Sequence, residues 1–218
     1  MILELSEIGI KFGVRDNYDT DLIVVKEMFE ENVYEIHGWH FDDKNGVVVD
    51  IGANIGAFSI QAASIGARKV FAVEPEPHNL IALKENIRLN NLGPIINVVE
   101  LGISDFSGEA TISDDGGGAS IKDCTSGSTI KITTLDQLFN NYNINNVNVL
   151  KIDVEGSEPE IILAASQTNL NKCKYIAIEF DVRTGAKLGD MVVKLSETHH
   201  VRTMGSWERG GMIFANRY

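Results

Sequence analysis

The chain has 218 residues, of which 44% are hydrophobic and 23% are charged, so it has the composition of a globular protein and a length that suits one α/β domain over residues 1–218. The net charge of −12 counts against a nucleic-acid partner, because phosphate binding needs a basic surface. The chain shows no membrane-length apolar run, no signal peptide and no metal-type spacing of Cys124 and Cys173, so we expect a cytoplasmic protein without a membrane partner or a metal.

Residues 1–46 are interpreted as an N-terminal extension that packs on the core. A strand is expected over residues 8–12, and a helix from Asp21 to about Phe29, where the apolar residues follow helical spacing. Two roles stay open for this extension. It covers the ligand or shapes a substrate pocket, or it only packs against the core.

Residues 47–56 combine a buried strand with a glycine-rich turn. Three valines and the two residues after them have the continuous apolar character of a parallel strand covered on both faces. Gly52 then allows a sharp turn and the close approach of a ligand, and Asn54 is placed to cap the following helix. The spacing from Asp50 to Gly56 is D-x-G-x-x-x-G, which differs from the G-x-G-x-x-G of a dinucleotide site.

The acidic residue at the end of this strand indicates the kind of ligand. Asp50 would repel a pyrophosphate, but it suits a ligand with an amine or a sulfonium, and S-adenosylmethionine (SAM) has both. The next strand, residues 69–73, ends in Glu74 and Pro75, where a carboxylate is placed to accept hydrogen bonds from both ribose hydroxyls. These motifs predict a SAM site, and a doubly wound fold whose glycines only serve packing is the alternative.

A helix and a third strand follow the predicted site. The helix is expected over residues 77–90 and the strand over residues 95–101. Because ligands gather at the carboxyl ends of parallel strands, Ser104 or Asp105 is placed to approach the adenine.

Residues 106–132 interrupt the alternation of strands and helices, and we expect a β/loop insertion near the mouth of the site. Strand-like segments at 108–112 and 130–133 enclose a glycine-rich loop at 113–129. Two interpretations of this loop stay open, a lid over the site and a surface hairpin.

Residues 147–158 carry the second group of chemical residues. The segment begins as a buried strand, in which Lys151, Asp153 and Glu155 alternate and share a face if the strand stays regular. Charged groups are costly there unless they are paired or functional. Glu158 follows at the start of a helix, whose dipole favours acidic side chains. We predict Asp153, Glu155, Glu158 and Lys151 as catalytic candidates, because each could take a proton from an acceptor.

The remaining residues complete the sheet. A fifth core strand is expected over residues 175–180 and a helix over residues 189–198. A terminal pair of strands is expected over residues 200–204 and 211–215.

These motifs together resemble the FkbM family of SAM-dependent methyltransferases over about residues 45–180. The glycine motif alone is typical of class I methyltransferases, and the run K-I-D-V-E-G-S-E at 151–158 narrows the resemblance to FkbM. The resemblance implies a Rossmann-like fold, with a three-layer αβα sandwich around a mostly parallel seven-stranded sheet that has one antiparallel strand. It also implies O-methylation of a hydroxyl on a small molecule or sugar.

The resemblance also implies roles for the motifs. The methionine part of SAM would contact the glycine turn, the ribose would contact Glu74, and Asp153 would meet the methionine amine or the substrate. The cofactor-binding residues that we predict are Asp50, Gly52, Ala53, Asn54, Gly56, Glu74, Pro75, Ser104, Asp105 and Asp153.

Other functions stay open at this point. A small-molecule N-methyltransferase is the nearest alternative, and a SAM-binding module without catalysis and an NAD-dependent oxidoreductase are two more. A DNA or RNA base methyltransferase typically has an N-P-P-Y-like stretch after the fourth strand, where this chain has D-V-E-G at 153–156. We therefore expect a small-molecule or saccharide acceptor, no nucleic acid, and a homodimer as the commonest form of assembly.

Overall fold

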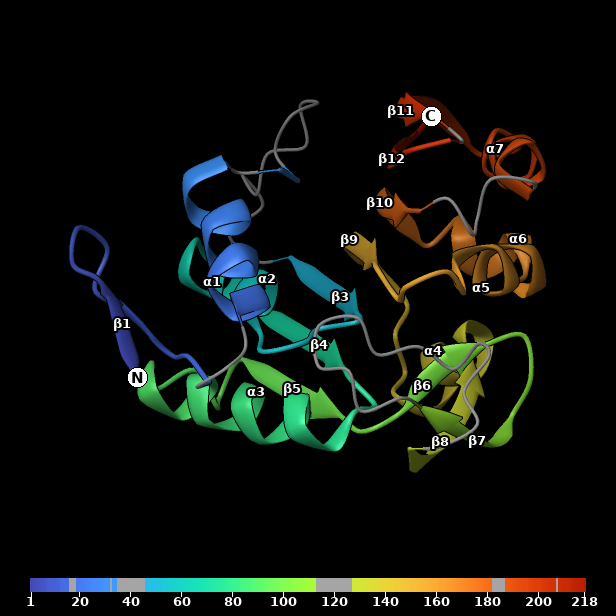
Figure 1. Ribbon diagram of the computed structural model, residues 1–218. Helices are drawn as coiled ribbons and strands as arrows, with labels where there is room; N and C mark the ends of the chain where they lie inside the picture. Colours follow the sequence, from blue (N-terminus) through green and yellow to red (C-terminus); the bar gives the residue numbers. More distant parts are fainter. Residues whose placement is uncertain (16–18, 32, 35–45, 113–126, 182–186, 207) are drawn as a thin grey trace.

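The computed structural model describes the chain except for residues 16–18, 32, 35–45, 113–126, 182–186 and 207. Its centre is a seven-stranded sheet with helices on both faces (Figure 1). The strands of this sheet are β3 (Val47–Ile51), β4 (Lys69–Val73), β5 (Ile96–Val99), β9 (Val147–Ile152), β10 (Cys173–Phe180), β11 (His199–Ser206) and β12 (Gly210–Arg217). Their order is β11-β12-β10-β9-β3-β4-β5, and only β12 runs antiparallel to its neighbours. The predicted fold class is confirmed.

The helices form the two outer layers. One face carries α1 (Asp19–Lys26), α2 (Ala57–Ser64) and α3 (Pro77–Leu89), and the other carries α4 (Leu135–Asn141), α5 (Glu158–Ala164), α6 (Gln167–Leu170) and α7 (Leu188–Leu195). None of the described helices is long and apolar enough to span a membrane.

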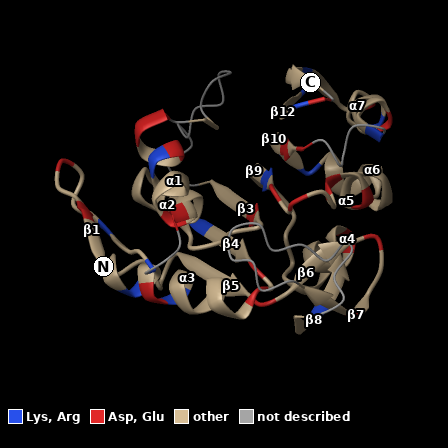
Figure 2. Cartoon of the chain, in the orientation of Figure 1, with Lys and Arg blue, Asp and Glu red and all other residues tan. Residues whose placement is uncertain are grey.

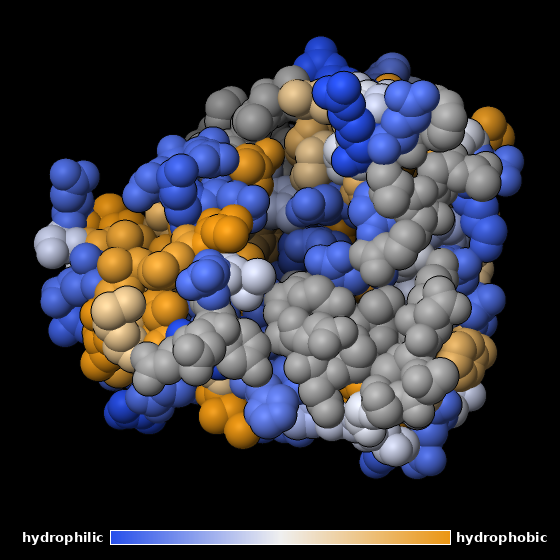
Figure 3. Space-filling view, viewed as in Figure 1, coloured by the Kyte–Doolittle hydropathy of each residue, from blue (hydrophilic) through white to orange (hydrophobic). Residues whose placement is uncertain are grey.

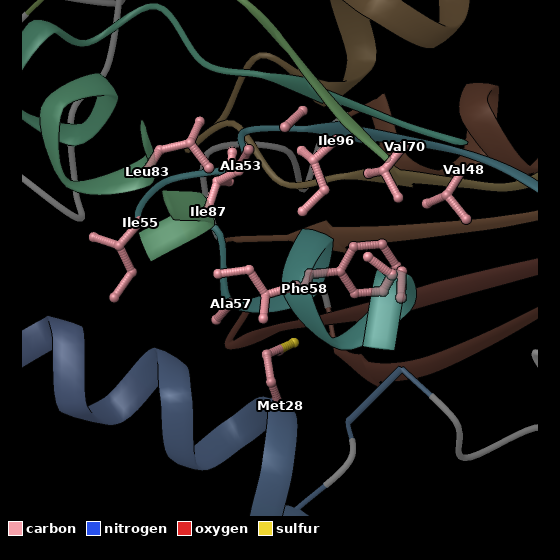
Figure 4. Packing of buried hydrophobic residues seen from close by; sticks show 14 of the residues in the cluster. Met28, Val48, Ala53, Ile55, Ala57, Phe58, Val70, Leu83, Ile87 and Ile96 are labelled. Atoms are coloured by element: carbon pink, nitrogen blue, oxygen red, sulfur yellow. The ribbon is translucent and has the colours of Figure 1, made fainter. Parts of the chain in front are cut away.

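Alternation along the strands builds a separate core on each face. Val48 and Val70 point towards α2 and α3, where they pack with Phe58 and Leu83 (Figure 4). Val49 and its equivalents on the neighbouring strands point the other way, towards α4, α5 and α7. A strand buried on both faces therefore needs apolar residues at every position, which explains the valine run at β3.

The N-terminal segment packs against the face that carries α3. It forms the antiparallel hairpin of β1 (Ile2–Leu5) and β2 (Ile10–Gly13), and β2 contacts α3. The helix expected from Asp21 begins at Asp19 and continues after α1 as one π-helical turn, η1 (Glu27–Glu31).

A second, three-stranded sheet lies beside the carboxyl ends of the main strands. It consists of β6 (Gly102–Ser104), β7 (Gly108–Ile112) and β8 (Ser128–Thr134), in the order β6-β8-β7. The third strand was expected to continue to residue 101, but β5 ends at Val99, because the chain leaves the main sheet to pair β6 with β8. Most of the predicted lid, residues 113–126, lies outside the described residues.

The glycine turn after β3 differs from the prediction at its cap. Asn54 was expected to cap α2, but it adopts a left-handed conformation with φ 51° and lies before the helix start. Gly56 is the N-cap instead, with φ 91°, a conformation that glycine adopts without strain. The turn is therefore two residues longer than expected, and α2 begins at Ala57.

Asn86 on α3 links the N-terminal hairpin to the glycine turn. Its side chain is fully buried, where Oδ1 accepts a hydrogen bond from Gly13 N (2.6 Å) and Nδ2 donates one to Ile55 O (2.9 Å). We expect Asn86→Ala to lower the free energy of unfolding by about 2–4 kcal/mol, because two buried backbone groups lose their partners.

Urea unfolding monitored by circular dichroism measures this loss. Ile81→Ala on the same helix is the control, because Ile81 is 69% exposed and its truncation is expected to change stability by less than about 0.5 kcal/mol. Equal losses in the two variants would contradict the role given to Asn86.

Candidate functional site

A cavity of about 350 Å³ lies at the carboxyl ends of the main strands. Figure 3 shows a recess near the middle of this face, with hydrophilic side chains inside it. The walls come from α1 and η1, the turn after β3, the end of β4, the start of the second sheet, and the ends of β9 and β10. This edge is where the fold class places ligands.

A buried lysine joins the two central strands next to the cavity. Lys151 Nζ lies 3.2 Å from Asp50 Oδ1 and 3.3 Å from Asp153 Oδ2, and it donates a hydrogen bond to Gly52 O (2.7 Å). Burial alone would lower the pKa of Lys151, but the carboxylates of Asp50 and Asp153 raise it above its ordinary value. Lys151 therefore stays charged and is fully engaged with its partners.

Asp50 is held inside the protein and does not line the cavity. It is fully buried, and its Oδ2 accepts a hydrogen bond from Ser59 Oγ (2.6 Å) in addition to the ion pair with Lys151. Its predicted contact with the methionine amine thus has no support in the geometry. Ala53 and Gly56 shape the same turn without lining the cavity.

Gly52 brings the glycine turn against the end of β9. Its φ is +79°, and a Cβ at this position would collide with the backbone oxygen of Asp153. Its N–H donates to Val73 O (3.0 Å), which ties the turn to the end of β4 as well. Gly52 and Asn54 line the cavity, as predicted for a ligand-binding turn.

Glu74 presents a buried carboxylate at the end of β4. It accepts hydrogen bonds from Asn54 N (2.7 Å), Glu76 N (3.0 Å) and Asn79 Nδ2 (3.3 Å). Burial raises the pKa of Glu74 to about 6, although the hydrogen bonds from Glu76, Asn54 and Asn79 lower it. Oε1 already accepts the bonds from Glu76 N and Asn79 Nδ2, whereas Oε2 accepts only that from Asn54 N and has further acceptor capacity, which suits a ligand hydroxyl.

Two further features of the lining suit a nucleoside. Asn54 Oδ1 is buried and has no hydrogen-bond partner among the described residues, so it is available to a donor in the cavity. Leu101, Ile103 and Ile112 form an apolar wall beside Glu74 and Pro75.

The structure does not bring Ser104 and Asp105 to this cavity. Ser104 is buried in β6 with its Oγ 3.3 Å from Asp105 Oδ1, and neither residue lines the cavity. The reason is the early end of β5 at Val99, which places Leu101 and Gly102 at the position expected for the adenine contact.

Three acidic side chains from distant parts of the chain line the cavity and interact with one another. They are Asp153 after β9, Glu179 on β10 and Glu27 on η1. Tyr34 Oη lies 3.5 Å from Asp153 Oδ2 and 3.3 Å from Glu179 Oε2. Burial and then Asp153 raise the pKa of Glu179 to about 7, and the same two causes raise the pKa of Glu27. Glu179 is also accessible to solvent through the cavity.

Of the other two acidic catalytic candidates, Glu155 lines the cavity and Glu158 does not. Glu155 lines the cavity from a left-handed backbone position with φ 58°. Glu158 is buried, and its Oε1 accepts hydrogen bonds from Val154 N (3.2 Å) and Gly156 N (3.0 Å). It therefore stabilises the loop between β9 and α5, and it does not line the cavity.

Sequence reasoning missed Glu179, Glu27 and Tyr34 as site residues. Glu179 had a usable signal, because it ends the strand next to β9 and so reaches the same edge of the sheet as Asp153. Glu27 and Tyr34 had none, because nothing local shows that residues 1–46 reach this edge. No group of three or more His, Cys, Asp or Glu side chains within the described ranges has the geometry to hold a metal ion.

Comparison with known proteins places these features among methyltransferases. The model of the methyltransferase FkbM domain matches residues 50–206. The chain is 30% identical over 111 residues to the ribosomal protein L11 methyltransferase of Geotalea uraniireducens, covering 50% of this chain and 34% of that protein. It is 28% identical over 210 residues to the AMB antimetabolite synthetase AmbE of Pseudomonas aeruginosa, covering 76% of this chain and 10% of that protein. The chain thus spans about a third or less of these relatives.

Solved structures share the architecture. The methyltransferase FkbM of Methylobacillus flagellatus has a TM-score of 0.58 at 18% identity. The match covers 79% of this chain and 44% of that protein. A methyltransferase of Streptococcus mutans in complex with SAH has a TM-score of 0.53 at 14% identity, and the match covers 84% of this chain and 95% of that protein. The tRNA m1G37 methyltransferase of M. jannaschii has a TM-score of 0.51 at 15% identity, and the match covers 100% of this chain and 56% of that protein. These similarities show a Rossmann-like methyltransferase fold.

The charge of Lys151 is expected to be essential for stability. Lys151→Met leaves the carboxylate of Asp50 buried without its cation, which should lower the free energy of unfolding by about 3–5 kcal/mol at neutral pH. Acid that protonates a buried carboxylate removes its uncompensated charge, and the variant then regains stability. The loss should therefore be smaller near about pH 4 than near about pH 7.

Urea unfolding at the two pH values checks this expectation. Lys84→Met is the control, because Lys84 forms an exposed ion pair with Glu100 that is expected to contribute less than about 1 kcal/mol. A loss for Lys151→Met that does not depend on pH would show that packing, and not charge, is the main contribution of this side chain.

Proposed function

The chain belongs to the FkbM family of methyltransferases, and on this basis we propose that it transfers a methyl group from SAM to a hydroxyl of a small molecule or saccharide. The observation that carries the proposal is one cavity that is lined both by the Glu74 carboxylate and by the Asp153–Glu179 pair. The first group suits the cofactor, and the second suits chemistry on an acceptor.

The described residues fit SAM. Glu74 would accept hydrogen bonds from the ribose hydroxyls, and the apolar wall around Leu101 and Ile103 would hold the adenine. Gly52 and Asn54 would hold the methionine part, with Asn54 Oδ1 as a free acceptor for its amine. SAM supplies an activated methyl group on its sulfonium, so the task of the protein is to align the acceptor and remove its proton.

Glu179 is the residue that we assign as general base. Asp153 is engaged in an ion pair with Lys151, and Glu158 accepts hydrogen bonds from backbone N–H groups. Glu179 lines the cavity, and burial together with the nearby Asp153 carboxylate raises its pKa to about 7. A base with a pKa near the working pH combines a useful ionised fraction with a strong pull on the proton. Asp153 and Tyr34 would position Glu179.

The remaining parts of the proposal rest on charge. A net charge of −12 and a cavity with several carboxylates support a small acceptor over a nucleic acid. A cytoplasmic location and a homodimer, the commonest form of assembly, complete the proposal. Methylation of an amine stays as the second candidate, because the same carboxylates would attract it. The placement of Glu179 as a base favours a hydroxyl, which must lose its proton as the new bond forms.

Binding of the cofactor tests the first part of the proposal. We expect the protein to bind SAM and SAH and not NAD in isothermal titration calorimetry. Glu74→Ala should weaken SAH binding by about 10–100-fold, because hydrogen bonds to a buried carboxylate are lost. Glu85→Ala is the control, because Glu85 is exposed on α3 and pairs with Arg88. Binding of NAD, or equal SAH affinity in both variants, would contradict this assignment.

The pH dependence of methyl transfer tests the base. Because Glu179 acts in its ionised form, kcat/KM should rise with pH through about 7 and then level off. Glu179→Gln should lower kcat by about 10²–10⁴-fold and remove this rise. Glu160→Gln is the control, because Glu160 pairs with Lys187 away from the cavity lining. A rise that persists in Glu179→Gln would assign the base to another residue.

A further inference from the structure

The charged side chains that line the cavity are all acidic. Five carboxylates line it, and the described lining contains no Lys, Arg or His. Figure 2 shows acidic residues in red near the label α1 and near the ends of β9 and β10. The five carboxylates are Glu27, Glu74, Asp153, Glu155 and Glu179.

The nearby cation does not balance this charge. The Lys151 ammonium lies behind the wall, where it is shared between Asp50 and Asp153 and also donates to Gly52 O. SAM would add one net positive charge, because its carboxylate offsets its amine. The acceptor end would therefore keep an excess of negative charge, which repels an anionic acceptor and attracts a cationic one.

Ser157 gives an independent sign that a ligand binds in this cavity. It is 2% exposed and lines the cavity, yet its Oγ has no hydrogen-bond partner in the part of the chain that the structure describes. A serine at the N-cap of a helix usually accepts a backbone N–H, but Ser157 makes no such bond at the start of α5. A buried hydroxyl without a partner is costly unless a ligand satisfies it.

We propose that the acceptor carries a protonated amine near the hydroxyl that is methylated, as in an amino sugar or an amino alcohol, and that Glu27 receives the ammonium while Ser157 hydrogen-bonds a neighbouring oxygen. This inference rests on the proposed methyl transfer. Glu27 and Glu155 are the lining carboxylates left for this role, since Glu74 serves the ribose, Asp153 pairs with Lys151 and Glu179 takes the proton. Of the two, we choose Glu27, because its carboxylate interacts with those of Asp153 and Glu179. Asp153 is close enough to Glu27 to raise its pKa, so the ammonium would bind within reach of both carboxylates.

Glu27 also has a position suited to acceptor selection. It belongs to η1, outside the residues 50–206 that match the family domain. The cofactor contacts lie within that range, while this wall of the acceptor end comes from the N-terminal segment. A change at Glu27 can therefore alter the acceptor without altering the residues assigned to the cofactor.

The test separates candidate acceptors by their charge. A bacterial small-molecule extract is separated by ion exchange into cationic, neutral and anionic fractions, and each is incubated with the full chain and SAM that carries a tritiated methyl group. We expect the cationic fraction to yield on the order of tenfold more labelled product than either other fraction. More label from the neutral or anionic fraction would overturn the inference.

Variants then assign the charge preference to residues. Glu27→Gln should raise KM for the cationic acceptor on the order of tenfold, while the rise of kcat/KM with pH, assigned to Glu179, persists. Ser157→Ala should also raise KM. Glu4→Gln removes the same charge from the exposed β1 strand and serves as the control. An unchanged KM in Glu27→Gln would overturn the role of Glu27.

The outcomes separate this inference from the function on which it rests. A wild-type protein that binds no SAH in calorimetry, or that labels no fraction, contradicts the methyltransferase proposal itself. A protein that binds SAH and labels mainly the anionic or neutral fraction keeps the methyltransferase proposal and overturns only the cationic acceptor.

Discussion

The buried ammonium of Lys151 is the interaction on which the site depends. It lies between β3 and β9, where it binds Asp50, Asp153 and the backbone oxygen of Gly52. Removing this charge from water is costly, and only such a complete set of partners offsets that cost. The same contacts fix the glycine turn, whose Asn54 N–H in turn orients Glu74. One ion-paired group thereby connects Asp153 and the glycine turn, and through that turn Glu74, on the cavity wall.

The sequence predicted those features that follow from rules of topology. Strands β3 and β9 are rich in Val, Leu and Ile because parallel strands are covered on both faces, so their presence could be inferred. The position of Glu74 at the cavity followed from the same reasoning, because the carboxyl ends of parallel strands share one edge of the sheet. Lys151 was correctly expected to need partners, although its role turned out to be ionic support of the turn.

The sequence could not predict features that depend on exact backbone paths or on distant contacts. The left-handed conformation of Asn54 moved the cap to Gly56, and the departure of β6 from the main sheet moved Ser104 and Asp105 away from the cavity. Tyr34 reaches Asp153 across 119 residues of sequence, a contact that only tertiary packing creates. Such contacts have no local pattern, and for this reason the acidic end of the site was only half predicted.

The N-terminal segment forms one wall of the cavity through Thr20, Ile23, Val24 and Glu27, although the family domain begins at residue 50. Two proteins of this family could thus share every residue of the domain and still differ in this wall. A difference in this wall would change the shape and charge of the cavity while the residues of the matched domain stay the same. An engineer could use the same division by replacing the N-terminal wall segment and keeping the family domain unchanged.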